Sequence, residues 1–216
     1  MADFTAARRN MVESQIRTNA VTQEVLLAAL AEIPREIFVP EALRGVAYID
    51  EDLPLKKGRY LMEPLVLAKL LQLAAITPDD VVLDIGCGTG YSAALLSKLA
   101  NTVVALESDP ELAARAMATL SELSIDNVVV VTAPLAGGYA KQAPYDVIVF
   151  NGSVPRIPET IARQLADGGR LVAVVGEGVG QGTLMTRNRG ILAQRPVFDA
   201  ATPILPDFVQ EPGFVF

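Results

Sequence analysis

From residue 80 onward, short apolar runs alternate with amphipathic stretches. The apolar runs fill 81–85, 102–107, 127–132, 145–150 and 170–175, which predicts five strands. Helical spacing occupies 90–100, 110–123 and 157–166 between them, and two more candidate strands follow at 181–187 and 191–198. This alternation predicts an α/β fold: a Rossmann-like, doubly wound, mainly parallel sheet with helices on both faces.

The first 75 residues have a different pattern. Residues 5–18 and 22–33 have helical spacing, and Thr22 is a candidate N-cap of the second helix. Residues 41–63 are rich in charge and read as irregular, whereas Pro64 opens a strongly apolar helix. We therefore interpret 1–75 as an N-terminal helical cap, packed in the same domain as a core formed by 76–216.

The segment 81–90, VVLDIGCGTG, is the most informative stretch of the chain. An apolar strand leads through Asp84 into glycines at 86, 88 and 90, and a helical pattern follows. Such a strand–turn–helix unit lets backbone N–H groups approach a bound cofactor. Tyr91 stands where a dinucleotide motif has its third glycine, and no lysine follows as in a P-loop, so pyrophosphate ligands are disfavoured. The alternative is a glycine turn that holds no ligand.

An acidic residue ends the next predicted strand. Glu107 follows the apolar run 102–106, about 20 residues beyond the glycine turn. In a βαβ unit this strand end lies beside the turn, where a carboxylate accepts hydrogen bonds from a ribose diol. Asp109 and Pro110 then read as the N-cap and first residue of a helix. The alternative interpretation of Glu107 is a solvated acid at a strand end.

Composition narrows the possible functions. The net charge is −7 and no basic stripe is visible, so we expect no nucleic-acid partner. The chain has no histidine, which disfavours zinc sites and Ser-His triads, and we expect no metal. The single cysteine allows no internal disulfide, and the N-terminus has no signal-peptide pattern, so we expect a cytoplasmic protein. Charged residues interrupt every apolar stretch, so we expect no membrane span.

The oligomeric state cannot be read from the sequence. Two late segments, 182–187 and the apolar end 212–216, either cover the edge of the sheet or contact another subunit.

Several spaced blocks resemble the protein-L-isoaspartate O-methyltransferase family, a branch of the class I S-adenosylmethionine-dependent methyltransferases. Residues 33–40, IPREIFVP, are similar to a family signature, and AYID at 47–50 matches the next block. The D-x-G-x-G-x-G pattern at 84–90, the strand ending at Glu107, and the segments 143–146 and 164–172 follow in the family's order. The resemblance implies a cofactor, S-adenosylmethionine, and methylation of a carboxylate in proteins or peptides that contain isoaspartyl residues.

The resemblance also implies site residues. The expected cofactor-binding positions are Asp84, Gly86, Cys87, Gly88, Thr89, Gly90, Glu107, Ser108, Pro134 and Leu135. The expected acceptor-side positions are Arg59, Tyr60, Met62, Asn151 and Ser153.

Three blocks depart from the family pattern. Tyr60 and Met62 replace a threonine and a serine in the block 58–64, where Arg59 is a possible anchor for a carboxylate. Pro134 replaces an acid near the adenine, which predicts weaker or differently arranged cofactor binding. Residues 151–153 read as a polar turn. Two alternative functions therefore stay open: a methyltransferase of this fold with another acceptor, including a small molecule, or a non-catalytic binding or regulatory protein.

Overall fold

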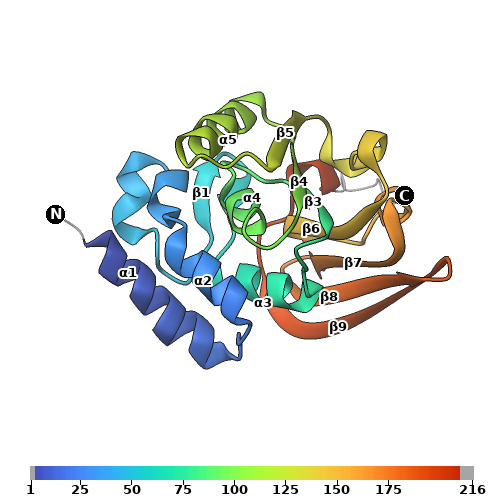
Figure 1. Ribbon diagram of the computed structural model, residues 1–216, viewed down its shortest axis with the longest axis horizontal. Helices are drawn as coiled ribbons and strands as arrows, with labels where there is room; N and C mark the ends of the chain where they lie inside the picture. The colour runs from blue at the N-terminus through green and yellow to red at the C-terminus, as the bar shows by residue number, and fades with distance from the viewer. Residues whose placement is uncertain (1–2, 210–216) are drawn as a thin grey trace, which may run out of the picture.

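A seven-stranded sheet forms the centre of the protein in a computed structural model, which describes residues 3–209 (Figure 1). Its strand order is β5-β4-β3-β6-β7-β8-β9. The five strands from β5 to β7 run parallel, and β8 and β9 add an antiparallel hairpin at one edge. The bounds are β3 (Val81–Ile85), β4 (Thr102–Glu107), β5 (Val128–Thr132), β6 (Tyr145–Val154), β7 (Leu165–Val175), β8 (Val179–Asn188) and β9 (Ile191–Ala201). The predicted doubly wound, mainly parallel fold is confirmed.

Alternate residues of the strands fill two apolar layers, one on each face of the sheet. Val82 and Val103 belong to the larger layer, whereas Leu83 and Val104 belong to the smaller one. Helices α3 (Pro64–Ala74) and α4 (Tyr91–Leu96), and the end of α5 (Pro110–Glu122), cover the larger layer. The short helix α6 (Glu159–Ala162) and 3-10 turns cover the other. Both faces are thus covered, but unequally.

The N-terminal residues pack on the larger layer. Helix α1 (Phe4–Asn10) continues into a π-helical stretch, Met11–Ile16, and a 3-10 turn, Arg17–Asn19, before α2 (Glu24–Glu32). Figure 1 shows these helices side by side at one end of the molecule, in blue. Further 3-10 turns cover Arg35–Phe38 and Glu41–Val46.

The prediction that 41–63 is irregular is wrong. Strands β1 (Leu53–Lys56) and β2 (Arg59–Leu61) form an antiparallel hairpin there, and Gly58 takes the positive φ of its turn (75°). The charged residues of the segment hid the apolar positions Leu53 and Leu61, which face each other and point into the core.

Three local predictions were also wrong. Thr22 does not cap α2, because Gln23 holds the N-cap position and the Thr22 amide donates to Gln72 instead. The helix predicted for 157–166 spans only Glu159–Ala162, since β7 already begins at Leu165. Residues 151–153 are not a turn: they continue β6, where Ser153 pairs with the segment after β9.

Helix α5 begins as expected, with Asp109 as its N-cap and Pro110 as its first residue. Within residues 3–209 no helix combines the length and apolar character that crossing a bilayer requires. Strand β8 includes the predicted segment 182–187, whereas the end 212–216 lies outside the described residues.

Candidate functional site

The glycine bend, residues 86–90, joins β3 to α4 at the carboxyl edge of the sheet. Gly86, Gly88 and Gly90 have φ values of 76°, 58° and 96°, in the left-handed region that favours glycine. The Gly86 amide donates to the carbonyl of Leu106 in β4, at 2.8 Å. The bend is therefore fixed against the neighbouring strand, and the motif predicts its backbone correctly.

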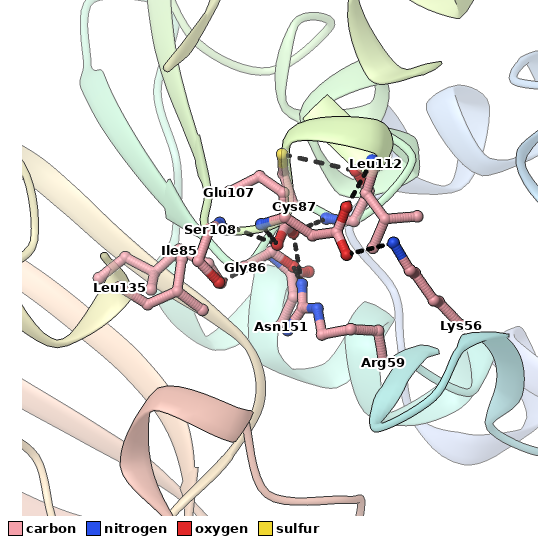
Figure 2. A network of polar contacts seen from close by, with 12 residues as sticks. Lys56, Arg59, Ile85, Gly86, Cys87, Glu107, Ser108, Leu112, Leu135 and Asn151 are labelled. Atoms are coloured by element: carbon pink, nitrogen blue, oxygen red, sulfur yellow. Dashed lines mark hydrogen bonds and ion pairs between the residues drawn. The ribbon is translucent and has the colours of Figure 1, made fainter. Parts of the chain in front are cut away.

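Glu107 ends β4 directly beside the glycine bend and is fully buried. Its Oε1 accepts from the amides of Ser108 (2.9 Å) and Asp109 (3.0 Å), and its Oε2 accepts from the amide of Gly88 (2.7 Å). A fourth donor is the side chain of Arg59 (Figure 2). Four donors satisfy the buried carboxylate, so the alternative interpretation, a solvated acid at a strand end, does not hold.

Arg59 reaches this carboxylate from the β1–β2 hairpin. Its neighbours in β2 alternate between core and solvent, so Arg59 and Leu61 point inward while Tyr60 points outward. The Arg59 Nη2 lies 2.5 Å from Glu107 Oε2 and 3.1 Å from the Gly86 carbonyl, and the side chain is only 5% exposed. Its Nε is buried and has no acceptor among the described residues. Arg59 thus belongs to the same polar cluster as the glycine bend.

Asp84 lies on β3 just before the bend and is fully buried. Its two oxygens accept from the Ser92 hydroxyl (2.7 Å) and from Asn151 Nδ2 (2.6 Å). Burial raises the pKa of Asp84 to about 6, the two hydrogen bonds oppose this shift, and the charge of Glu107 adds to it. Asp84 and Asn151 therefore form one buried polar pair between β3 and β6.

The other expected cofactor positions surround the bend. Burial raises the pKa of the Cys87 thiol well above its usual value, which makes it a poor nucleophile. The Thr89 hydroxyl donates to the Phe38 carbonyl at 2.5 Å. Pro134 and Leu135 follow β5, and the Leu135 side chain is buried.

The expected acceptor-side residues do not all come together. Arg59 and Asn151 lie in the polar cluster, whereas the Tyr60 side chain is exposed and Met62 is buried in the apolar layer under the N-terminal helices. Ser153 is buried on β6, and its hydroxyl has no partner within residues 3–209.

Besides the expected cofactor and acceptor positions, the structure brings a segment to the site that the sequence did not predict there, residues 203–208. The segment 203–208 leaves β9 at the edge and returns to the middle of the sheet, where its red turn lies in Figure 1. A Cβ built on Gly86 would come within 2.9 Å of Leu205 Cδ2, and one built on Gly152 within 2.8 Å. Asp207 accepts from the Leu135 amide at 2.6 Å, and the rings of Phe208 and Phe150 make an edge contact. The apolar residues of 203–208 indicate that part of the segment is buried, but they do not indicate which part of the sheet it contacts.

The polar groups at this carboxyl edge, which we call the crevice, match the chemistry of an adenosyl cofactor, but two side chains of the protein itself lie against them. A glycine bend with a strand-end carboxylate is the arrangement that holds a ribose diol. Here Arg59 donates a hydrogen bond to Glu107 Oε2, and the Leu205 side chain fills the space beside Gly86 and Gly152. A nucleoside fits only if these two side chains move.

Comparisons with known proteins give a consistent picture. The family model of protein-L-isoaspartate(D-aspartate) O-methyltransferase matches residues 6–197. A protein-L-isoaspartate O-methyltransferase of Koribacter versatilis is 39% identical over 199 residues, which cover 92% of this chain and 90% of that protein. One of Methanoculleus marisnigri is 43% identical over 169 residues, or 78% of this chain and 77% of that protein.

Solved structures agree on the fold. A protein-L-isoaspartate O-methyltransferase structure superposes with a TM-score of 0.78 at 25% identity, covering 91% of this chain and 65% of that one. A structure from Plasmodium falciparum, described as a protein-L-isoaspartate O-methyltransferase in complex with S-adenosyl-L-homocysteine, has a TM-score of 0.80 at 18% identity and covers 96% of this chain and 100% of that one.

Proposed function

Since this chain belongs to the protein-L-isoaspartate(D-aspartate) O-methyltransferase family, we propose that it transfers a methyl group from S-adenosylmethionine to a carboxylate of isoaspartyl residues in proteins. The match over 6–197 carries this proposal, because it spans the cap, the glycine bend and most of the sheet. The fold supports it, since the bend and Glu107 lie together at the carboxyl edge of parallel strands, where ligands of such sheets bind.

The reaction class suits a chain without histidine. A carboxylate is already an anion at neutral pH, so it attacks a sulfonium methyl group without a general base. S-adenosylmethionine supplies that methyl group when it is bound. The protein then contributes alignment of the reacting groups and exclusion of water.

We assign roles to residues within this proposal. The glycine bend and Glu107 hold the cofactor, with Glu107 on the ribose side, and Asp84 supports the bend through Ser92 and Asn151. Ser153, whose buried hydroxyl is free within the described chain, offers a hydrogen-bond donor on the acceptor side.

Methylation of a matched peptide pair tests the function. Purified protein is incubated with labelled S-adenosylmethionine and a peptide that contains either isoaspartate or aspartate at one position. We expect label to enter the isoaspartyl peptide as a base-labile methyl ester, and the aspartyl peptide to stay unlabelled. Absence of ester from both peptides, with folded protein, would contradict the proposal, and labelling of another acceptor class would redirect it.

A further inference from the structure

The carboxyl-edge crevice is filled by the protein's own side chains. Two parts close it: Arg59, from the β1–β2 hairpin, and a segment that we call the strap, residues 203–208. We infer that they form an autoinhibitory closure, which has to open before the cofactor binds. This inference rests on the proposed function, because it concerns the same site.

The strap runs beside β6 and reaches the glycine bend. It pairs with β6, since the Ser153 amide donates to the Pro203 carbonyl at 2.9 Å and the Leu205 amide donates to the Ser153 carbonyl at 3.0 Å. The Leu205 side chain, 3% exposed, then packs against Gly86 and Gly152. In a motif whose glycines serve to let a ligand approach the backbone, an internal side chain takes the ligand's place.

The acidic residue of the strap, Asp207, accepts hydrogen bonds from two donors beside the crevice. Asp207 Oδ2 accepts from the Leu135 amide at 2.6 Å, and its Oδ1 lies 3.3 Å from the Ser108 hydroxyl. Leu135 and Ser108 are both expected cofactor positions. The strap therefore satisfies polar groups that a bound nucleoside would otherwise meet.

Arg59 binds the Glu107 carboxylate, which the ribose of a cofactor would also bind. Three of the four donors to Glu107 are backbone amides, fixed by the glycine bend and by the start of α5. Arg59 is the remaining donor, and it is the one that rotates away without a change of backbone. A ribose diol that binds Glu107 must displace it, which breaks a buried ion pair.

Two features of the closed arrangement favour its opening: the exposure of the strap and an unsatisfied donor on Arg59. Leu205 is the one buried residue of the strap, and Pro206 and Asp207 are exposed. The other strap residues are partly or fully exposed, as expected of a segment that opens locally. The buried Arg59 Nε has no acceptor in the described part of the chain, so the closed arrangement also leaves one donor unsatisfied.

Affinity for S-adenosylhomocysteine tests the inference without any turnover. We compare wild type with R59Q, which keeps a hydrogen-bond donor but loses the charge, and with L205A, which empties the space beside the bend. Each substitution should raise the affinity measured by calorimetry about tenfold or more. Because L205A changes a buried side chain, D207A provides a variant at an exposed position that removes both side-chain contacts of Asp207, with D199A on β9 as its matched control. D207A should raise the affinity and D199A should not.

Fluorescence reports whether the strap moves. The chain has no tryptophan, so F208W places a single indole on the strap. We expect saturating S-adenosylhomocysteine to shift its emission to the red as the indole leaves Phe150, while V197W, exposed on the edge strand β9, should not respond.

The outcomes separate the two proposals. If wild type binds S-adenosylhomocysteine as tightly as R59Q, L205A and D207A, and the F208W emission stays fixed, the autoinhibitory closure is refuted while the proposed function is unaffected. If no variant binds although circular dichroism shows each to be folded, the crevice is not a cofactor site, and both the function and the closure are refuted.

Discussion

Buried charge is concentrated in a few side chains of this protein. Arg35 is fully buried and donates to the carbonyls of Ala47 (2.7 Å) and Met62 (2.8 Å), while its guanidinium lies over the Tyr91 ring at 4.9 Å. Burial lowers the pKa of Arg35. The residue comes from the IPREIFVP block, and the contacts explain why an arginine stands there: it joins the loops at Ala47 and Met62 to the start of α4 through contacts that an apolar side chain could not make.

A second charged position is Glu63, just before α3. Burial, together with the nearby charges of Asp50 and Asp52, raises the pKa of Glu63 to about 7, against the opposing effect of Lys69 and Arg35. A carboxyl whose pKa is higher in the folded state binds protons more tightly there, so its ionisation weakens folding as the pH rises from about 4.5 to 7.

We therefore predict that E63Q stabilises the protein at pH 8 and leaves it unchanged at pH 4. The glutamine avoids ionisation in a partly buried site next to two acids. Since Glu63 is only half-buried, the gain should be about 1 kcal/mol after solvent screening. Urea unfolding between pH 4 and 8 measures it, with the exposed position E41Q as control. Equal curves for E63Q and wild type at every pH would disprove the assignment.

Among the elements, the glycine bend has the strictest backbone requirement. Gly90 is the N-cap of α4 with a φ of 96°, and a Cβ there would lie 3.2 Å from the Cβ of Ala116 in α5. Both the left-handed backbone and the close helix packing exclude a side chain. The third glycine thus serves packing between α4 and α5 as well as the turn.

The corresponding prediction concerns G90A. Strain in the backbone and crowding against α5 should lower the free energy of unfolding by about 2 kcal/mol or more. G137A is the matched control, because Gly137 does not have a positive φ and a Cβ there would meet nothing within 4 Å. Thermal or urea denaturation compares them. A G90A variant as stable as G137A would show that the bend tolerates a side chain.

At the scale of the whole molecule, the N-terminal cap and the sheet share one apolar layer. Side chains of Leu26 and Leu30 in the cap belong to the same buried cluster as Val82 and Val103. Polar contacts also cross the boundary: Arg115 of α5 donates to the Val39 carbonyl at 2.6 Å. We propose, as the sequence already predicts, that residues 1–75 do not form a separate domain.

A calorimetric scan tests this proposal. A shared core predicts one cooperative transition, with equal calorimetric and van't Hoff enthalpies. Two resolved transitions, or a van't Hoff enthalpy well below the calorimetric one, would indicate that the cap unfolds on its own.

Much of the fold follows from local patterns, because strands and helices are encoded by the spacing of apolar residues over a few positions. That spacing predicts the strands β3 to β7 and the two late strands β8 and β9, and the glycine bend follows from its three glycines. Errors occurred where strand residues are charged or polar, as in the β1–β2 hairpin and at 151–153, the end of β6.

The sequence alone determined the α/β sheet, the glycine bend at its carboxyl edge and the acid at the end of β4, since each depends on neighbours along the chain. Only the tertiary structure decided what occupies that edge. Arg59 meets Glu107 across 48 positions of sequence, and Leu205 reaches Gly86 from beyond the last strand. Such contacts depend on how the hairpin and the strap fold back onto the sheet, and no local pattern of residues specifies that path.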